Sequence, residues 1–142
     1  MLLDETISNL SKKLRSRELS SVDLVKDAYK NIDKYNSKIN SFITLQDKND
    51  VLKEAELSDK NRDIDSSPLN GIPFVMKDSY VTCGIRTTSA SKVLEDYVPQ
   101  YSATVYQKLL DSGAILIGKN NMDAWGHGGT NENSDFGPVK NT

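Results

Sequence analysis

The stretch Ile72-Pro73-Phe74-Val75-Met76-Lys77-Asp78 decides the fold class of this chain, because an apolar run ends there in two charged residues. Apolar runs of about four to eight residues are typical of buried strands. In open α/β sheets, reacting groups gather where strands end. A lysine that is partly buried at such a point can lose its proton near neutral pH and act as a base. The stretch therefore favours an α/β fold and makes Lys77 one candidate catalytic residue.

A second lysine, Lys119, closes the run Ala114-Ile115-Leu116-Ile117-Gly118 in the same way. Lysines at strand ends often do no more than extend their ammonium group into water. Position alone therefore does not decide between Lys77 and Lys119. The surrounding sequence has to separate them.

Five stretches of the chain carry a resemblance to known proteins. They are Leu69–Pro73 leading to Lys77-Asp78, Gly84–Ser91, Ala103–Val105, Ile117–Asp123 and Asn131–Asn141. In residue identity, order and spacing they resemble the amidase signature family, and most closely the A subunits of the tRNA-dependent amidotransferases. The first half of the chain resembles the family more loosely, through its helix pattern and the segment Ile39-Asn40-Ser41-Phe42-Ile43-Thr44.

The resemblance implies a Ser-cisSer-Lys hydrolase with Lys77 in the position of the family lysine. There the lysine deprotonates a bridging serine, which in turn deprotonates the nucleophilic serine. Both serines belong to a Gly/Ser-rich signature further along, and no Gly-Gly-Ser-Ser stretch occurs in this chain. We therefore expect residues 1–142 to be a single truncated domain, the N-terminal part of the amidase fold, inactive by itself. In it, 1–66 is a mostly helical segment, and 67–142 begins the α/β core, a mixed sheet covered by helices.

The loop Gly126-His127-Gly128-Gly129-Thr130 has three glycines in its first four positions, which lets the backbone approach a ligand closely. A flexible turn is the alternative interpretation. The resemblance implies that this loop lines the acyl pocket, with His127, Gly128, Gly129 and Thr130 as candidate substrate-binding residues. Many relatives have methionine near His127 and serines near Gly129 and Thr130, so the size and polarity of this pocket differ from the usual pattern.

The function implied by the resemblance is glutamine hydrolysis that supplies ammonia for converting Glu-tRNA(Gln) to Gln-tRNA(Gln), or Asp-tRNA(Asn) to Asn-tRNA(Asn). A B subunit would activate the tRNA-bound acid with ATP and magnesium, a C subunit would brace the pair, and tRNA would be held only through the partner subunit. Two alternatives stay open. One is a stand-alone amidase of another small amide, and the other is a non-catalytic binding or assembly fragment.

The composition fits these expectations without selecting among them. Eighteen basic and twenty acidic residues give a net charge of −2 and form no basic stripe of the kind that nucleic-acid binding usually shows. The start, Met1-Leu2-Leu3-Asp4-Glu5, has no apolar export segment, and no later apolar run approaches the ~20 residues of a membrane span. We therefore expect a cytoplasmic protein without membrane contact. One histidine and one cysteine make a metal site improbable.

Two other motifs are set aside. Gly113–Asn120 nearly spells a phosphate-binding loop, but the residues between its glycines are apolar and predict a strand, so no cofactor is expected in this chain. Cys83 and His127 could form a thiol-imidazole pair, although nothing in the sequence orients the histidine. Asp78 is interpreted as a residue that turns the chain after the strand.

The remaining patterns predict the order of elements. Helices are expected over Thr6–Arg17, from Ser20 onward with Val22, Val25, Tyr29 and Ile32 on one apolar stripe, over Asp50–Asn61, and after a capping Ser102 with Tyr106, Leu109 and Leu110 facing inward. Strands are expected over Ile39–Leu45 and Ala114–Ile117, with Gly113 closing the last helix. A right-handed parallel connection is the default for the strand–helix–strand unit.

Overall fold

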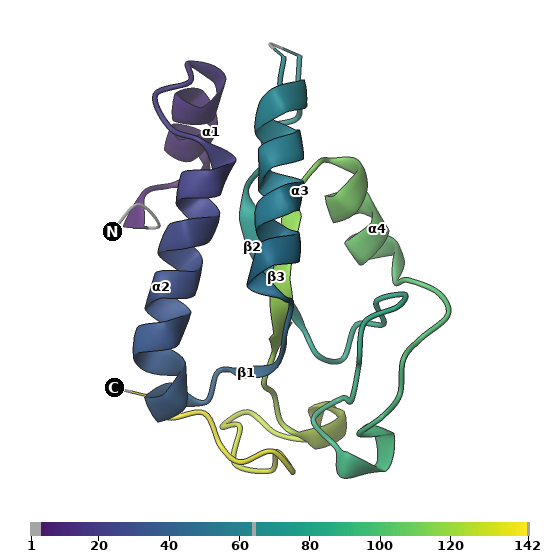
Figure 1. Cartoon of the computed structure of the whole chain (residues 1–142). Helices are drawn as coiled ribbons and strands as arrows, with labels where there is room; N and C mark the ends of the chain where they lie inside the picture. Colours follow the sequence, from purple (N-terminus) through teal and green to yellow (C-terminus); the bar gives the residue numbers. More distant parts are fainter. Residues whose placement is uncertain (1–3, 64, 142) are drawn as a thin grey trace. The chain divides into compact units, whose positions relative to one another are not determined.

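A computed structural model describes residues 4–63 and 65–141 (Figure 1). Its main elements in chain order are α1 (Ile7–Arg15), α2 (Ser21–Ile39), β1 (Phe42–Leu45), α3 (Lys48–Asn61), β2 (Pro73–Lys77), α4 (Thr104–Asp111) and β3 (Ile115–Asn120), with short 3-10 turns at Lys92–Leu94 and Ala124–Gly126. Helices and a sheet together confirm the predicted α/β class.

The three strands form one mixed sheet in the order β1-β3-β2. β1 pairs antiparallel with β3, from Phe42 opposite Asn120 to Leu45 opposite Gly118. The hydrogen bonds beside β2 and β3 show the relative direction of these strands. Gly71 N donates to Gly113 O (2.7 Å) and Ile115 N donates to Ile72 O (3.0 Å), so the residue numbers rise together on both strands. β2 and β3 are therefore parallel, which confirms the predicted mixed sheet. The handedness of their connection stays a prediction.

The chain divides into two compact units, each built from three segments. The first consists of Met1–Lys34, Gln46–Phe74 and Lys108–Ile117, and the second of Tyr35–Leu45, Val75–Gln107 and Gly118–Thr142. In the first unit, Leu10, Leu14, Leu24 and Ile72 form a buried cluster against which Leu19 packs. The predicted division into residues 1–66 and 67–142 does not follow these units and stays a prediction.

The start of α2 shows how closely local sequence sets a helix boundary. The hydroxyl of Ser20 accepts a hydrogen bond from Asp23 N (3.0 Å), and the Asp23 carboxylate accepts one from Ser20 N (3.2 Å). This reciprocal arrangement is a capping box, as the sequence predicts. The buried stripe of α2 differs in part from the prediction, because it consists of Leu24, Val25, Ala28 and Tyr29, while Val22 and Ile32 are only half-buried.

The predicted cap of α4 is wrong. The helix begins at Thr104, two residues after Ser102, and its first bond runs from Gln107 N to Ala103 O (3.0 Å). The Ser102 hydroxyl instead accepts a hydrogen bond from Cys83 N (3.0 Å). Leu110, expected to face inward, is exposed.

Two strand boundaries in the structure also differ from the predicted ones. Ile39 is the last residue of α2, so the strand predicted to begin there starts at Phe42. β3 continues to Asn120, past the predicted end at Ile117, because the polar residues after it extend the pairing with β1. Gly113 closes α4 as predicted, at a φ of 78° that favours glycine.

Candidate active site

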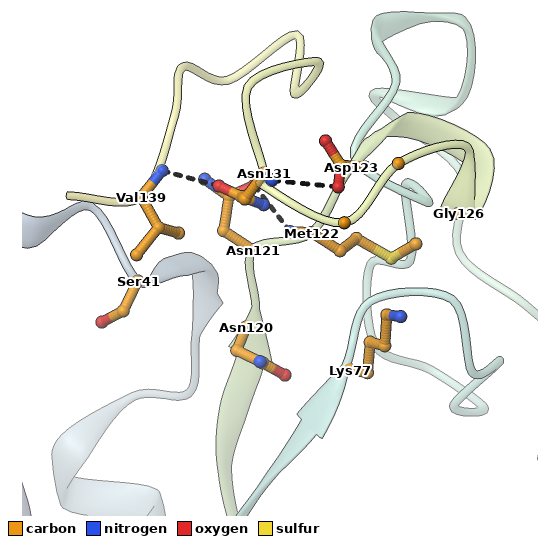
Figure 2. A pocket seen from close by; sticks show the side chains of 11 residues that line it. Ser41, Lys77, Asn120, Asn121, Met122, Asp123, Gly126, Asn131 and Val139 are labelled. Atoms are coloured by element: carbon orange, nitrogen blue, oxygen red, sulfur yellow. Dashed lines mark hydrogen bonds between the residues drawn. The ribbon is translucent and has the colours of Figure 1, made fainter. Parts of the chain in front are cut away.

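The second unit contains a cavity of about 370 Å³ where β2 and β3 end (Figure 2). Its lining comes from the residue before β1, the ends of β2 and β3, and the loops that follow β3. The lining residues are Ser41, Lys77, Asn120, Asn121, Met122, Asp123, Gly126, Gly128, Gly129, Asn131 and Val139. The cavity therefore brings the candidate lysine and part of the glycine loop to one place.

Lys77 reaches the cavity from the last position of β2, and its side chain is exposed. Among the described residues its ammonium group has no hydrogen bond or ion pair. The expected partial burial of Lys77 is therefore wrong for this chain. The described residues do not cover this face of β2: Lys77 shares it with Val75, which is also exposed, while Met76 on the other face is buried.

The buried lysine is Lys119, whose exposed fraction is 0%. Its ammonium group donates to Tyr80 O (2.9 Å), to the Thr82 hydroxyl (3.1 Å) and to the Thr87 hydroxyl (2.7 Å). It also forms an ion pair with Asp78 Oδ1 at 3.5 Å. Burial lowers the pKa of Lys119, and the charge of Asp78 opposes that shift. All three ammonium donors are engaged, so Lys119 is a structural anchor.

Asp78 holds the loop that follows β2. Its Oδ2 atom accepts hydrogen bonds from Thr88 N (2.9 Å), from the Thr88 hydroxyl and from Ala90 N (3.4 Å). These bonds fix Ser89 and Ala90 in left-handed backbone conformations, with φ of 51° and 57°. Since the side chain of Asp78 is fully buried, this geometry agrees with the structural role predicted for it.

The glycine loop is packed against Asp123. A Cβ atom on Gly128 would stand 2.6 Å from Asp123 Cγ, so only glycine fits there without displacing the carboxylate. That carboxylate accepts hydrogen bonds from Asn131 N (2.9 Å) and Asn133 N (3.2 Å). Gly129, in contrast, has no atom within 4 Å of an added Cβ.

The structure brings only part of the predicted substrate-binding set to the cavity. Gly128 and Gly129 line it with Lys77, whereas His127 and Thr130 are exposed and are not among the lining residues. The Thr130 hydroxyl donates to Glu132 Oε2 (2.9 Å). The roles of all four residues in binding stay predictions. Cys83 is exposed too, and the described residues show no contact between it and His127.

Several polar lining residues escaped the sequence interpretation. Asn121 is buried and joins three segments: its Nδ2 donates to Asn40 O (3.1 Å) and Gly137 O (2.9 Å), and its Oδ1 accepts from the Ser134 hydroxyl (2.7 Å). The signal that could have found these residues is the polar run Asn120–Asp123, which begins at the last residue of β3. The carboxyl ends of parallel strands meet at one edge of a sheet.

No group of three or more His, Cys, Asp and Glu side chains that could hold a metal ion occurs in residues 4–63 and 65–141. The stretch that resembles a phosphate-binding loop forms β3, so its amides pair with neighbouring strands and cannot curl around a phosphate. In the part of the chain that the structure describes, no helix is both long enough and apolar enough to cross a membrane.

Comparison with known proteins gives a consistent result. The profile of the amidase family matches residues 23–142. The A subunit of the glutamyl-tRNA(Gln) amidotransferase of Saccharolobus solfataricus is 44% identical over 135 residues, which cover 95% of this chain and 27% of that protein. The chain thus spans less than a third of the length of this curated relative.

Solved structures show the same fold. The A subunit of the glutamyl-tRNA(Gln) amidotransferase of Thermotoga maritima superposes with a TM-score of 0.76 at 27% identity, over 99% of this chain and 28% of that one. The native peptide amidase of Stenotrophomonas maltophilia superposes with a TM-score of 0.84 at 26% identity, over 95% of this chain and 29% of that one. Since the family profile covers most of its length and its fold matches, the chain belongs to the amidase family.

Proposed function

We propose that this chain is part of a glutamine-hydrolysing amidotransferase subunit in which Lys77 is the general base. The observation that carries the proposal is the cavity that Lys77 shares with Gly128 and Gly129, in a chain 44% identical to the A subunit of an amidotransferase. In this proposal the two serines of the mechanism come from outside residues 1–142. Lys77 has an unengaged ammonium group with which to meet them.

The proposed reaction is a stepwise amide hydrolysis. Neutral Lys77 takes a proton from the bridging serine, which takes the proton of the nucleophilic serine. The nucleophile attacks the glutamine side-chain amide, an acyl-enzyme forms, and ammonia leaves with the proton that Lys77 held. Water then releases glutamate. Because burial favours an uncharged amine, residues that cover the exposed Lys77 would prepare it for the first step.

The rest of the proposed assembly follows from the amidotransferase assignment. A B subunit would use ATP and magnesium to activate tRNA-bound glutamate or aspartate, and a C subunit would brace the complex. The tRNA would contact the B subunit, and the amidation reaction would take place in the cytoplasm. The net charge of −2 supports an assignment of tRNA contacts to a partner.

A stand-alone amidase is the second candidate. It is supported by the TM-score of 0.84 with the Stenotrophomonas peptide amidase, against 0.76 with the Thermotoga amidotransferase protein, at similar identities. The two glycines at positions 128 and 129 would suit a pocket for a bulkier amide. A third candidate, a non-catalytic assembly piece, would account for an exposed Lys77 without a partner.

The test is Lys77→Ala in the complete gene product assayed with its partner subunits. Loss of the base should reduce glutamine hydrolysis by about 10²- to 10⁴-fold, while transamidation from free ammonium stays near the wild-type rate. Lys92→Ala, which removes another exposed lysine of the same unit, is the control and should change neither rate.

Each candidate gives a different result in this assay. Loss of both activities in Lys77→Ala would mean a structural role for Lys77. Hydrolysis of peptide amides in preference to glutamine would favour the stand-alone amidase. Wild-type activity in Lys77→Ala would contradict the assignment of the base. The 142-residue chain by itself should release no ammonia from glutamine.

A further inference from the structure

Asn131 carries a buried hydrogen-bond donor that nothing in the described chain satisfies. Its Nδ2 atom is inaccessible to water and has no partner. Its Oδ1 atom accepts a hydrogen bond from Val139 N at 2.6 Å. This bond distinguishes the oxygen from the nitrogen of the side-chain amide, because a flipped side chain would place the donor Nδ2 against the donor Val139 N.

The backbone of Asn131 is held as firmly as its side chain. Asn131 N donates to Asp123 Oδ2 at 2.9 Å, and the residue has a φ of 61°, a conformation that asparagine tolerates better than most residues. Figure 2 shows these bonds beside the cavity. An orphaned donor on a residue held at both ends calls for an explanation.

The hydrogen bonds of the described residues include no acceptor for Nδ2. Two acceptors of the same loops already accept other hydrogen bonds: Asp123 accepts from two backbone amides, and Asn121 Oδ1 accepts from Met122 N and from the Ser134 hydroxyl. Lys77 lines the same cavity and has no hydrogen bond to Asn131 among the described residues. An oxygen atom of a ligand would accept the hydrogen bond that Asn131 Nδ2 can donate.

We propose that Asn131 is a specificity-determining residue whose Nδ2 donates to a carbonyl or carboxylate oxygen of the amide substrate in the cavity shared with Lys77. The inference rests on the proposed amidase function and adds a contact to it. Because Nδ2 is buried, its access to the substrate requires a small movement of the loop. The bond would orient the substrate and take no part in proton transfer.

A purely structural role is the rival explanation, since Asn131 also holds Val139. Asn131→Asp separates the two roles. Aspartate keeps the oxygen that accepts from Val139 N and tolerates a positive φ, but it removes the Nδ2 donor. Asn133→Asp is the matched control, because Asn133 lies in the same loop, is exposed and is not among the residues that line the cavity.

The first readout is steady-state glutamine hydrolysis by the complete gene product with its partners. Asn131→Asp should raise KM about tenfold and leave kcat within about twofold, because one substrate hydrogen bond is lost in ground and transition state alike. Asn133→Asp should change KM by less than about twofold. An unchanged KM in Asn131→Asp, or a fall in kcat with the melting temperature, would overturn the proposal.

The second readout does not need turnover and so separates this inference from the proposed function. In ¹⁵N-labelled protein, the side-chain NH₂ signals of Asn131 are identified by their absence in Asn131→Asp. Titration with glutamine, and separately with acetamide, should move these signals saturably. If neither probe moves them, the inference is wrong. If acetamide moves them in a protein that does not hydrolyse glutamine, the inference stands and the choice of substrate is wrong.

Discussion

The ends of β2 and β3 carry the same residue type in opposite environments. Lys77 is exposed, lines the cavity and has no partner among the described residues, whereas Lys119 is fully buried, donates three hydrogen bonds and pairs with Asp78. The loop that follows β2 covers Lys119 through Tyr80, Thr82 and Thr87, whereas the described residues leave the face of β2 with Lys77 exposed. The loop that packs on the strand end, and not the residue type there, decides which lysine is covered.

This comparison separates stability from chemistry. A buried cation with every donor engaged stabilises the loop around it and is poorly placed to exchange a proton with a substrate. A lysine that faces a cavity without partners contributes little to stability and is free to act. Variants of the two lysines should therefore fail in different assays.

The largest effect is expected from Lys119→Met. The substitution leaves the carboxylate of Asp78 buried without its cation, and breaking a buried pair in this way costs about 3–5 kcal/mol of unfolding free energy. Lys77→Met should change the same quantity by no more than about 0.5 kcal/mol, as exposed side chains usually do. Urea unfolding of the two variants measures the difference.

A double variant sharpens this prediction. Lys119→Met combined with Asp78→Asn removes both charges, so part of the lost stability should return and the two effects should not add. Equal shifts for Lys119→Met and Lys77→Met would show that the two strand ends are not as different as the contacts indicate.

Much of the fold was predictable because local signals specify it. The capping box of Ser20 and Asp23, the glycine stop at Gly113 and the apolar run before Lys77 each act over a few residues, and each prediction is confirmed. The cap at Ser102 was wrong because a backbone amide 19 residues away, Cys83 N, competes for its hydroxyl. Such competition depends on tertiary contacts.

The site was less predictable for the same reason. Pattern and resemblance together identify Lys77 and the glycine loop, but not the burial of Lys119, since the sequence of a strand end does not show which loop will cover it. The orphaned amide of Asn131 depends on a bond to Val139, eight residues away, that no periodicity encodes.

A smaller effect is expected on the cavity side, where the glycine loop packs against Asp123. Gly128→Ala would force the Asp123 carboxylate away from its two backbone donors, which should cost about 1–3 kcal/mol. Gly129→Ala meets no atom and should change stability by no more than about 0.5 kcal/mol. Thermal unfolding compares them, and equal melting temperatures would contradict the close approach at Gly128.

The smallest effect concerns pH and again belongs to the buried lysine. Burial lowers the pKa of Lys119 in the folded protein below the 10.5 of an exposed lysine. Between the two values the unfolded chain binds more protons than the folded one, so stability should rise as pH rises. Tyr29 acts in the opposite sense, because burial raises its pKa from 10.0 to about 12, and its contribution is lost as pH rises through that range.

Measurements between about pH 8 and pH 9 stay below most of the titration of tyrosine, and the comparison with Lys119→Met isolates the lysine. There the unfolding free energy of the wild type should gain up to about 1.4 kcal/mol per pH unit relative to Lys119→Met, the limit set by one proton. Tyr29→Phe should leave this gain unchanged. If the wild type and Lys119→Met have the same slope, Lys119 keeps its charge throughout, which would mean that Asp78 and the loop hydroxyls outweigh burial at this strand end.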